Sequence, residues 1–368
     1  MPFLTDRIAQ TQRAQKLAAA MNDENLLPAE AAPRAAPRFM PASRFTFDLT
    51  MIERELRGNI VGQDEMIASV MRIMTVICAD IGDPRKPLAS FLFAGPTGVG
   101  KTETVRVLAR ALHGDADAFC RVDMNTLAQE HYAAALTGAP PGYVGSKEGT
   151  TILDQDKIEG SHDRPGIVLF DELEKASDEV VLALLNVLDN GILTVASGER
   201  TYSFRNAIVF MTTNLGASEL MERAGVTKPA GRGKRVQPQT GPELVLEKLL
   251  KRFPPEFVNR IDQIETFNAI GTDFLPAIVE VEIGKLNRRL LKHDCHLEVG
   301  PEVMRHLAEL GYDKRFGARG LRRTIRKHLE FPLAEYLLSA AATGSSVNRR
   351  IITAVLEGQT LTFVEGDA

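Results

Sequence analysis

Short apolar runs and amphipathic stretches follow one another along most of the chain. Four segments have the length and side chains of short strands, at 91–94, 119–123, 167–170 and 207–211. Helix-period patterns lie between and before them, for example from Asp64 to about Asp80 and from Val180 to Asn190. A helix capped by Asp48 or Thr50 is expected to run through Leu56. This alternation predicts an α/β domain whose mostly parallel sheet is covered by helices.

The pattern changes near residues 267–272, where a second domain is expected to begin. Helices are predicted near 273–292, 301–310 and 318–338, and short strands at 296–299, 350–356 and 361–364. We therefore place a large domain at 45–267 and a small α+β domain at 268–368. Residues 1–44, with their Ala/Pro-rich linker, precede both domains, and a basic Gly/Pro-rich insertion spans 225–241. Either segment would suit docking of an adaptor.

Composition excludes several classes of protein. The 368 residues carry a net charge of −4, which gives no general attraction to nucleic acid or to anionic membranes. The three cysteines form no disulfide framework, and no apolar run approaches the roughly 18 residues that a membrane span needs. A cytoplasmic location is expected, with an organelle transit peptide in residues 1–21 as the alternative.

The stretch from Gly95 to Thr102 carries the strongest chemical signal. It fits G-x-x-x-x-G-K-[ST], lies after an apolar strand and precedes a helix expected from Glu103. Such a loop turns backbone N–H groups toward phosphate oxygens at the positive end of a helix. Its lysine reaches the β- and γ-phosphates, and its threonine hydroxyl is a Mg²⁺ ligand. We predict that a nucleoside triphosphate contacts all eight residues of the loop: Gly95, Pro96, Thr97, Gly98, Val99, Gly100, Lys101 and Thr102. The plain alternative is a glycine-rich turn.

Two acidic residues end the apolar run at 167–170. In a doubly wound sheet, the carboxyl ends of the strands form the edge where ligands bind. Asp171 is predicted to hold Mg²⁺, and Glu172 to polarise a water molecule for attack on the γ-phosphate. Alone, the pair would be a charge pair at a helix N-terminus.

A series of motifs, in a fixed order, identifies a family. The chain resembles the AAA+ ATPases of the Clp unfoldase and disaggregase family, and most of all the second ATPase module of ClpB-like proteins. The motifs are Gly95–Thr102, Ala139-Pro140-Pro141-Gly142-Tyr143-Val144-Gly145, Leu169–Ala176, Thr213-Asn214-Leu215-Gly216, Phe253–Asp262 and Phe316-Gly317-Ala318-Arg319. The resemblance covers about residues 45–365. It implies a P-loop, three-layer αβα large domain, a small α+β lid domain, and hydrolysis of ATP with Mg²⁺.

The resemblance also assigns roles to single residues. Asn214 matches the sensor asparagine that helps to place the attacking water, and Arg319 matches the second sensor arginine. Arg260 matches the arginine finger that reaches the nucleotide of a neighbouring subunit. Ile60 and Val61 match the adenine pocket, although ordinary core residues would look the same.

Gly142, Tyr143, Val144 and Gly145 match a pore loop that grips polypeptide in the central channel of a ring. An aromatic ring gives contact area that tolerates any peptide sequence, and the glycines let the loop move. Pore loops and a finger that acts in trans both imply a homohexamer acting on protein substrates.

Some features depart from the family. Peptidase-coupled relatives carry an Ile/Leu-Gly-Phe/Leu tripeptide after the sensor asparagine, and residues 217–242 contain none, so docking to a protease chamber is not expected. Gly320 stands where the family often has proline. His293, Cys295, His296 and His306 are close in sequence, but their spacing fits no common zinc pattern.

The sequence therefore predicts an ATP-driven, single-ring protein-remodelling enzyme. Two alternatives stay open: a nucleotide-switched scaffold within a larger assembly, and an AAA+ loader stimulated by nucleic acid. The scaffold would work without the Tyr143 loop, and the loader would show DNA-stimulated, strongly salt-dependent activity.

Overall fold

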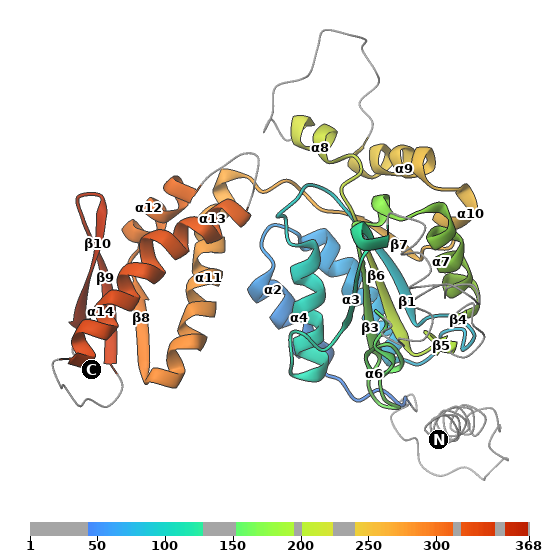
Figure 1. Cartoon of the computed structure of the whole chain (residues 1–368), viewed down its shortest axis with the longest axis horizontal. Helices are drawn as coiled ribbons and strands as arrows, with labels where there is room; N and C mark the ends of the chain where they lie inside the picture. The colour runs from blue at the N-terminus through green and yellow to red at the C-terminus, as the bar shows by residue number, and fades with distance from the viewer. Residues whose placement is uncertain are drawn as a thin grey trace, which may run out of the picture.

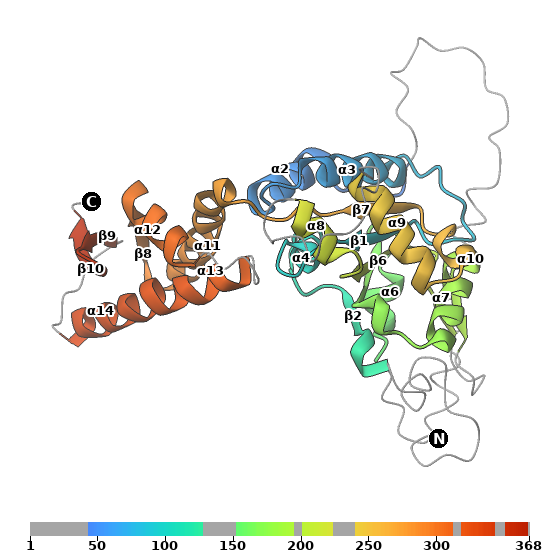
Figure 2. The same cartoon turned by 90° about the horizontal axis from the view of Figure 1, so that it is seen from above.

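The chain forms two bodies, each with its own sheet. The computed structural model describes residues 43–127, 152–194, 201–223, 240–311, 318–342 and 350–366. The N-terminal body has a five-stranded sheet and the C-terminal body a three-stranded one. Figure 1 shows that the N-terminal body is the larger, and Figure 2 shows the same division from above. Within the described ranges, no helix combines the length and the apolar character that crossing a bilayer requires.

All strand pairs of the five-stranded sheet are parallel, which confirms the predicted mostly parallel sheet. The order across the sheet is β2-β3-β6-β1-β7. Its strands are β1 (Ala89–Ala94), β2 (Cys120–Asp123), β3 (Gly166–Asp171), β6 (Ala207–Thr213) and β7 (Gln263–Thr266). A separate antiparallel hairpin, which the sequence pattern did not predict, consists of β4 (Ile192–Thr194) and β5 (Thr201–Ser203).

Helices cover both faces of this sheet and make the domain a three-layer αβα structure. Alternate strand residues point to opposite faces, so each strand supplies two cores. The helices are α2 (Leu49–Asn59), α3 (Asp64–Cys78), α4 (Lys101–His113), α6 (Gln155–Glu159), α7 (Asp178–Asn190), α8 (Ala217–Arg223), α9 (Gly241–Arg252) and α10 (Pro255–Val258), with 3-10 turns η1 (Met124–Leu127) and η2 (Leu173–Lys175). Phe91, Phe93 and Phe210 pack on one side of the sheet with α2, α3 and α4, while Leu92 and Phe170 pack on the other side with α7, α9 and α10.

Parallel pairing places the carboxyl ends of the strands at one edge of the sheet. In the register, Ala94 lies beside Thr213, and Asp123 lies beside Asp171. The glycine loop after β1, the acidic pair at the end of β3 and Asn214 after β6 therefore share this edge. The topology thus brings together residues that are far apart in sequence.

The C-terminal body packs helices on a mixed sheet of order β10-β9-β8. Its apolar core includes Val279, Leu297, Leu307, Leu321 and Ile352. The elements are η3 (Thr272–Phe274), α11 (Leu275–Leu290), η4 (Leu291–His293), β8 (Cys295–Val299), α12 (Pro301–Gly311), α13 (Ala318–Ile325), a π-helical turn η5 (Arg326–Glu330), α14 (Phe331–Ala342), β9 (Arg350–Glu357) and β10 (Thr360–Gly366). These positions agree with the predicted helices and strands of a small α+β domain.

One predicted helix differs from the structure. The sequence pattern predicts regular helix over 318–338, but a π-helical turn separates α13 from α14. Pro332 has no N–H to donate to the carbonyl four positions earlier, which weakens the regular helical ladder at this point. The Phe331 N–H instead bonds to the carbonyl of Arg326, five positions earlier.

The segment that leaves β7 packs directly on the start of the glycine loop. The Phe267 N–H donates to the Ala94 carbonyl at 2.7 Å. A side chain at Gly95 would place its Cβ 2.8 Å from the Phe267 carbonyl oxygen, and Gly95 has φ of 144°. Gln63, which is buried, then fixes Asn268 by donating to its carbonyl at 3.0 Å and accepting from its N–H at 2.9 Å. The entry to the second domain is therefore fixed against the loop.

Candidate active site

A cavity of about 330 Å³ lies at the carboxyl edge of the sheet and is lined by both domains. Most of the residues that the sequence analysis singled out line it: Ile60, Val61, Thr97, Gly98, Val99, Gly100, Lys101, Thr102, Asp171, Glu172, Asn214 and Arg319. Gly95 and Pro96 do not line the cavity, but their carbonyls contact Lys101.

The glycine loop opens directly into α4. Gly98 and Gly100 have φ of 78° and 111°, a backbone region that side chains disfavour. Gly100 caps the helix, so α4 begins at Lys101 rather than at the predicted Glu103. The N–H groups of Lys101, Thr102 and Glu103 have no acceptor among the described residues. These free donors, together with the helix dipole, suit an anion such as a phosphate.

Lys101 is buried beneath this loop, with an exposed fraction of 8%. Its ammonium group donates to the carbonyls of Gly95 and Pro96, and to Asn214 Oδ1 at 3.0 Å. Burial lowers the pKa of Lys101 to about 8, and Arg319 acts in the same direction, against the nearby carboxylates of Glu174, Asp171 and Glu172. The Lys101 ammonium group therefore lies at the cavity, where it can bind the phosphate oxygens of a nucleotide.

The Asp171 carboxylate is fixed on both of its oxygens. Oδ1 accepts from the Thr212 hydroxyl, and Oδ2 accepts from Arg121 at 2.6 Å. A carboxylate offers about four acceptor positions, so these contacts leave room for a cation ligand. Asp171 and the Thr102 hydroxyl line the same cavity and supply the oxygen donors that Mg²⁺ prefers. The residues therefore fit the predicted metal.

Glu172 has a left-handed backbone, with φ of 59° and ψ of 52°. Such a conformation is costly for a residue with a side chain and must be imposed by its surroundings. The Thr212 hydroxyl accepts from the Glu172 N–H at 3.0 Å, while the Glu172 carboxylate accepts from the Asn125 side chain. Thr212 thus fixes both acidic residues at the end of β3.

Asn214 connects the buried lysine with a further carboxylate. Its Oδ1 accepts from Lys101, and its Nδ2 donates to Glu174 Oε1 at 3.0 Å. The other oxygen, Glu174 Oε2, is buried and has no hydrogen-bond partner in the part of the chain that the structure describes. The Asn214 amide is therefore oriented by a cation on one side and an anion on the other.

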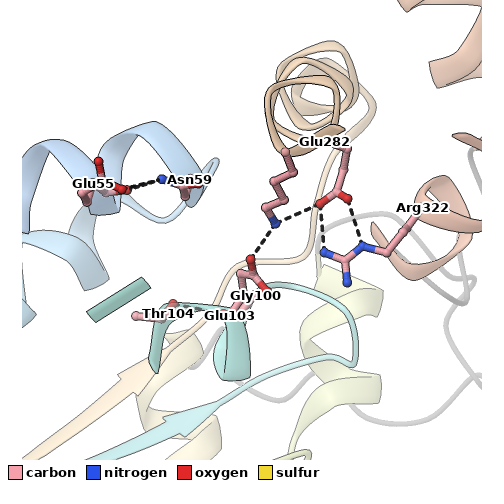
Figure 3. A network of polar contacts seen from close by, with 8 residues as sticks. Glu55, Asn59, Gly100, Glu103, Thr104, Glu282 and Arg322 are labelled. Carbon is pink, nitrogen blue, oxygen red and sulfur yellow. Dashed lines mark hydrogen bonds and ion pairs between the residues drawn. The ribbon is translucent and has the colours of Figure 1, made fainter. Parts of the chain in front are cut away.

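The second domain contributes cations to the opposite wall of the cavity. Arg319, on α13, is exposed and lines it. One turn further, Arg322 donates to Glu282 on α11 through two nitrogens, at 3.0 and 2.9 Å. Lys285, also on α11, bridges Glu282 and Glu103 in the first turn of α4. Figure 3 shows Glu103, Glu282 and Arg322 in this network. This chain of charges links the second domain to the helix that follows the glycine loop.

Several predicted residues do not reach the cavity. Arg260 lies after α10, where its Nε is 2.7 Å from Asp189 Oδ1 on α7. The predicted pore loop, Gly142 to Gly145, lies outside the described residues, as do residues 1–42 and most of the 225–241 insertion. Cys295 begins β8, and no group of three metal-ligating side chains is found in the parts of the chain that the structure describes.

Sequence reasoning assigned no role to four residues that fix the site: Arg121, Asn125, Thr212 and Glu174. The first two lie on or just after β2, and Thr212 lies two positions before Asn214 on β6. Their position at or near the carboxyl ends of strands could have indicated a role. Their contact partners could not be predicted, because the Thr212–Asp171 and Asn125–Glu172 contacts span 41 and 47 positions.

Comparison with known proteins supports the interpretation of this geometry. A family model described as "AAA domain (Cdc48 subfamily)" matches residues 86–264, and one described as "C-terminal, D2-small domain, of ClpB protein" matches residues 271–349. The "ATP-dependent protease ATP-binding subunit-like protein AmiB" of Pseudomonas aeruginosa is 56% identical over 99% of this chain and 100% of its own length. The chain belongs to the Clp family of AAA+ ATPases.

More distant Clp relatives are longer than this family member. Chaperone protein ClpB of Pseudomonas putida is 38% identical, over 86% of this chain but 34% of its own length. A structure titled "S. cerevisiae Hsp104:casein complex, Extended Conformation" matches with a TM-score of 0.70 at 32% identity, over 86% of this chain and 52% of the other. The chain thus spans about a third of ClpB and about half of Hsp104. These relationships identify it as an ATPase with the AAA fold and a ClpB-type small domain.

Proposed function

We propose that the chain is an ATP-driven protein-remodelling motor that assembles into a single-ring hexamer and threads polypeptide through its pore. The observation that carries this proposal is the convergence of Lys101, Asp171, Glu172 and Asn214 at one sheet edge, in a cavity closed by Arg319. Such a site is built to hold and cleave a triphosphate. A cytoplasmic location and protein substrates are part of the same proposal.

Each side chain has a defined task in hydrolysis. Lys101 and the first-turn N–H groups of α4 bind the β- and γ-phosphates, while Ile60 and Val61 give the adenine an apolar wall. Thr102 and Asp171 would hold Mg²⁺, which would supply positive charge against the phosphates when bound. The Glu172 carboxylate takes a proton from the attacking water, and Asn214 orients that water. Arg319 stabilises the charge that develops on the γ-phosphate.

Two observations support action in a ring. Arg260 lies away from its own cavity, as a residue that completes a neighbour's site must. Gly142-Tyr143-Val144-Gly145 has the aromatic ring and flanking glycines of a peptide-gripping loop. The Hsp104 match is a complex with casein, a polypeptide, which fits the same substrate class.

Replacing Tyr143 tests the threading step. Tyr143→Ala is expected to keep ATP hydrolysis within about threefold while unfolding of a tagged fluorescent protein falls at least about tenfold, because the aromatic contact area is lost. Tyr143→Phe, which keeps the ring, serves as the matched control and should unfold normally. Normal unfolding by Tyr143→Ala would favour the nucleotide-switched scaffold instead.

A further inference from the structure

Among the residues that the structure describes, one carboxylate of the same subunit contacts the Arg260 side chain. Its Nε lies 2.7 Å from Asp189 Oδ1, with Arg260 48% exposed and Asp189 29% exposed. The Nε contact is an ion pair, and among the described residues no hydrogen bond is found from any Arg260 side-chain nitrogen, Nη1 and Nη2 included. The contact therefore lies at the inner nitrogen of the guanidinium. The outer pair of nitrogens, which binds phosphate oxygens in a fork, stays available.

Asp189 occupies an unfavourable place for an acidic residue. It lies in the last turn of α7, where the helix dipole favours cations, and that turn carries no basic residue. Local helix preference therefore does not explain an aspartate at this position, whereas its ion pair with Arg260 does.

The backbone beneath Arg260 is also fixed. Asp262 Oδ2 accepts from the N–H and the hydroxyl of Ser90, at 2.8 and 2.7 Å. The Asp262 N–H donates back to the Ser90 hydroxyl at 2.9 Å, and Ile261 is buried in the core beside α7. Ser90 lies on β1, the strand that runs into the glycine loop. With the backbone fixed, the direction of the Arg260 side chain depends on Asp189.

We propose that Asp189 is a positioning residue for Arg260: it anchors the guanidinium through Nε so that Nη1 and Nη2 face the nucleotide of the neighbouring subunit. This inference rests on the proposed role of Arg260 in trans. A half-exposed ion pair adds little to stability, so the contact acts through geometry. A displacement of about 1 Å in a catalytic group can cost on the order of a hundredfold in rate.

Mixed rings separate the two partners of each active site. Arg260→Ala subunits keep their own hydrolytic residues but supply no finger, whereas Glu172→Gln subunits supply a finger but do not hydrolyse. Each is inactive alone, and mixing them before ATP is added should restore hydrolysis at the Arg260→Ala sites. Adding Asp189→Asn to the Glu172→Gln subunit should reduce the restored kcat at least about tenfold, with the KM for ATP unchanged.

The same substitution on the other subunit is the folding control. When mixed with Glu172→Gln subunits, the double variant Arg260→Ala with Asp189→Asn should regain as much hydrolysis as Arg260→Ala does, because Asp189 in that subunit has no arginine to hold. Asp178→Asn on the Glu172→Gln subunit is the matched control, since it removes an aspartate from the same helix whose partner is Arg252. Full restoration by that control is expected.

Two results would overturn the inference in different ways. The first result is that, in mixed rings, the Glu172→Gln subunit restores hydrolysis equally well with and without Asp189→Asn. Asp189 then does not position Arg260, although Arg260 can still act in trans. If the simple mixture forms mixed rings, seen by native mass spectrometry, but restores nothing, the role of Arg260 in trans is wrong and the inference fails with it.

Discussion

At the scale of single residues, the protonation of Lys101 governs the affinity of the site for a nucleoside triphosphate. Without a nucleotide this lysine is buried, and burial lowers its pKa from 10.5 to about 8. Between these values an unfolded chain binds more protons than the folded chain does. This group therefore raises the free energy of unfolding as pH rises from about 8. A bound triphosphate has the opposite preference, because it favours the charged ammonium.

Nucleotide affinity should consequently fall as pH rises through about 8. Above this value, binding must return a proton to Lys101, and affinity should drop by up to about tenfold per pH unit. Calorimetric titration with a non-hydrolysable ATP analogue, in buffers of different ionisation enthalpy, would measure both the affinity and the proton uptake. Lys101→Met should bind weakly at every pH and show no such slope. Constant affinity between pH 7 and about 9.5 would contradict the role of Lys101.

At the scale of elements, α11 connects the second domain to the first turn of α4. Lys285 pairs with Glu103 from α4 and with Glu282, and both of its ion pairs are largely buried, with Lys285 19% exposed. Arg322 shares Glu282, on the helix that carries Arg319. These ion pairs therefore connect α11 to the helix that would bind the phosphates.

Breaking the α11–α4 contact should weaken nucleotide binding without unfolding either domain. Lys285→Met removes the pair with Glu103 but leaves Glu282 and Arg322 together, and the affinity for a fluorescent ATP analogue is expected to fall about three- to tenfold. Arg289→Met is the matched control on the same helix, because Arg289 pairs with Glu330 inside the second domain. Equal affinity of Lys285→Met and the unchanged protein would show that this contact has no part in binding.

At the scale of the whole molecule, the two arginines assigned to hydrolysis lie in different places. Arg319 lines the cavity from the second domain, whereas Arg260 pairs with Asp189 and does not line it. If Arg260 acts in trans as proposed, a second copy of the chain supplies this arginine to each site. Assembly would then be part of the active site and not only of the motor.

Hydrolysis per subunit should therefore rise with protein concentration. Between about 10 nM and about 10 μM, the rate should follow the fraction of assembled rings, because each site needs a neighbour. Arg260→Ala should stay slow at all concentrations, about a thousandfold below the assembled protein. Parallel mass photometry would give the fraction assembled. A rate per subunit that does not change while rings dissociate would refute the shared site.

Much of the site could be predicted because its parts have short-range signals. The loop from Gly95 to Thr102 needs its glycines and lysine at fixed spacing, so a few neighbouring residues define it. Asp171 was found because it follows an apolar strand, and parallel strands end at a common edge. Asn214 was assigned through the resemblance to the Clp family. The π-helical turn was not predicted because the helical pattern was read through Pro332, and the hairpin was not predicted because the three-residue strands β4 and β5 carry weak local signals.

The sequence by itself determined that a nucleotide loop, two carboxylates and an asparagine lie at one sheet edge, because motif spacing and strand order are written along the chain. Only the tertiary structure decided how these groups are held. Thr212 fixes Asp171 across 41 positions, Lys101 reaches Asn214 across 113, and Asp189 meets Arg260 from another helix. Such contacts depend on packing between elements that are distant in sequence, and no local pattern records them.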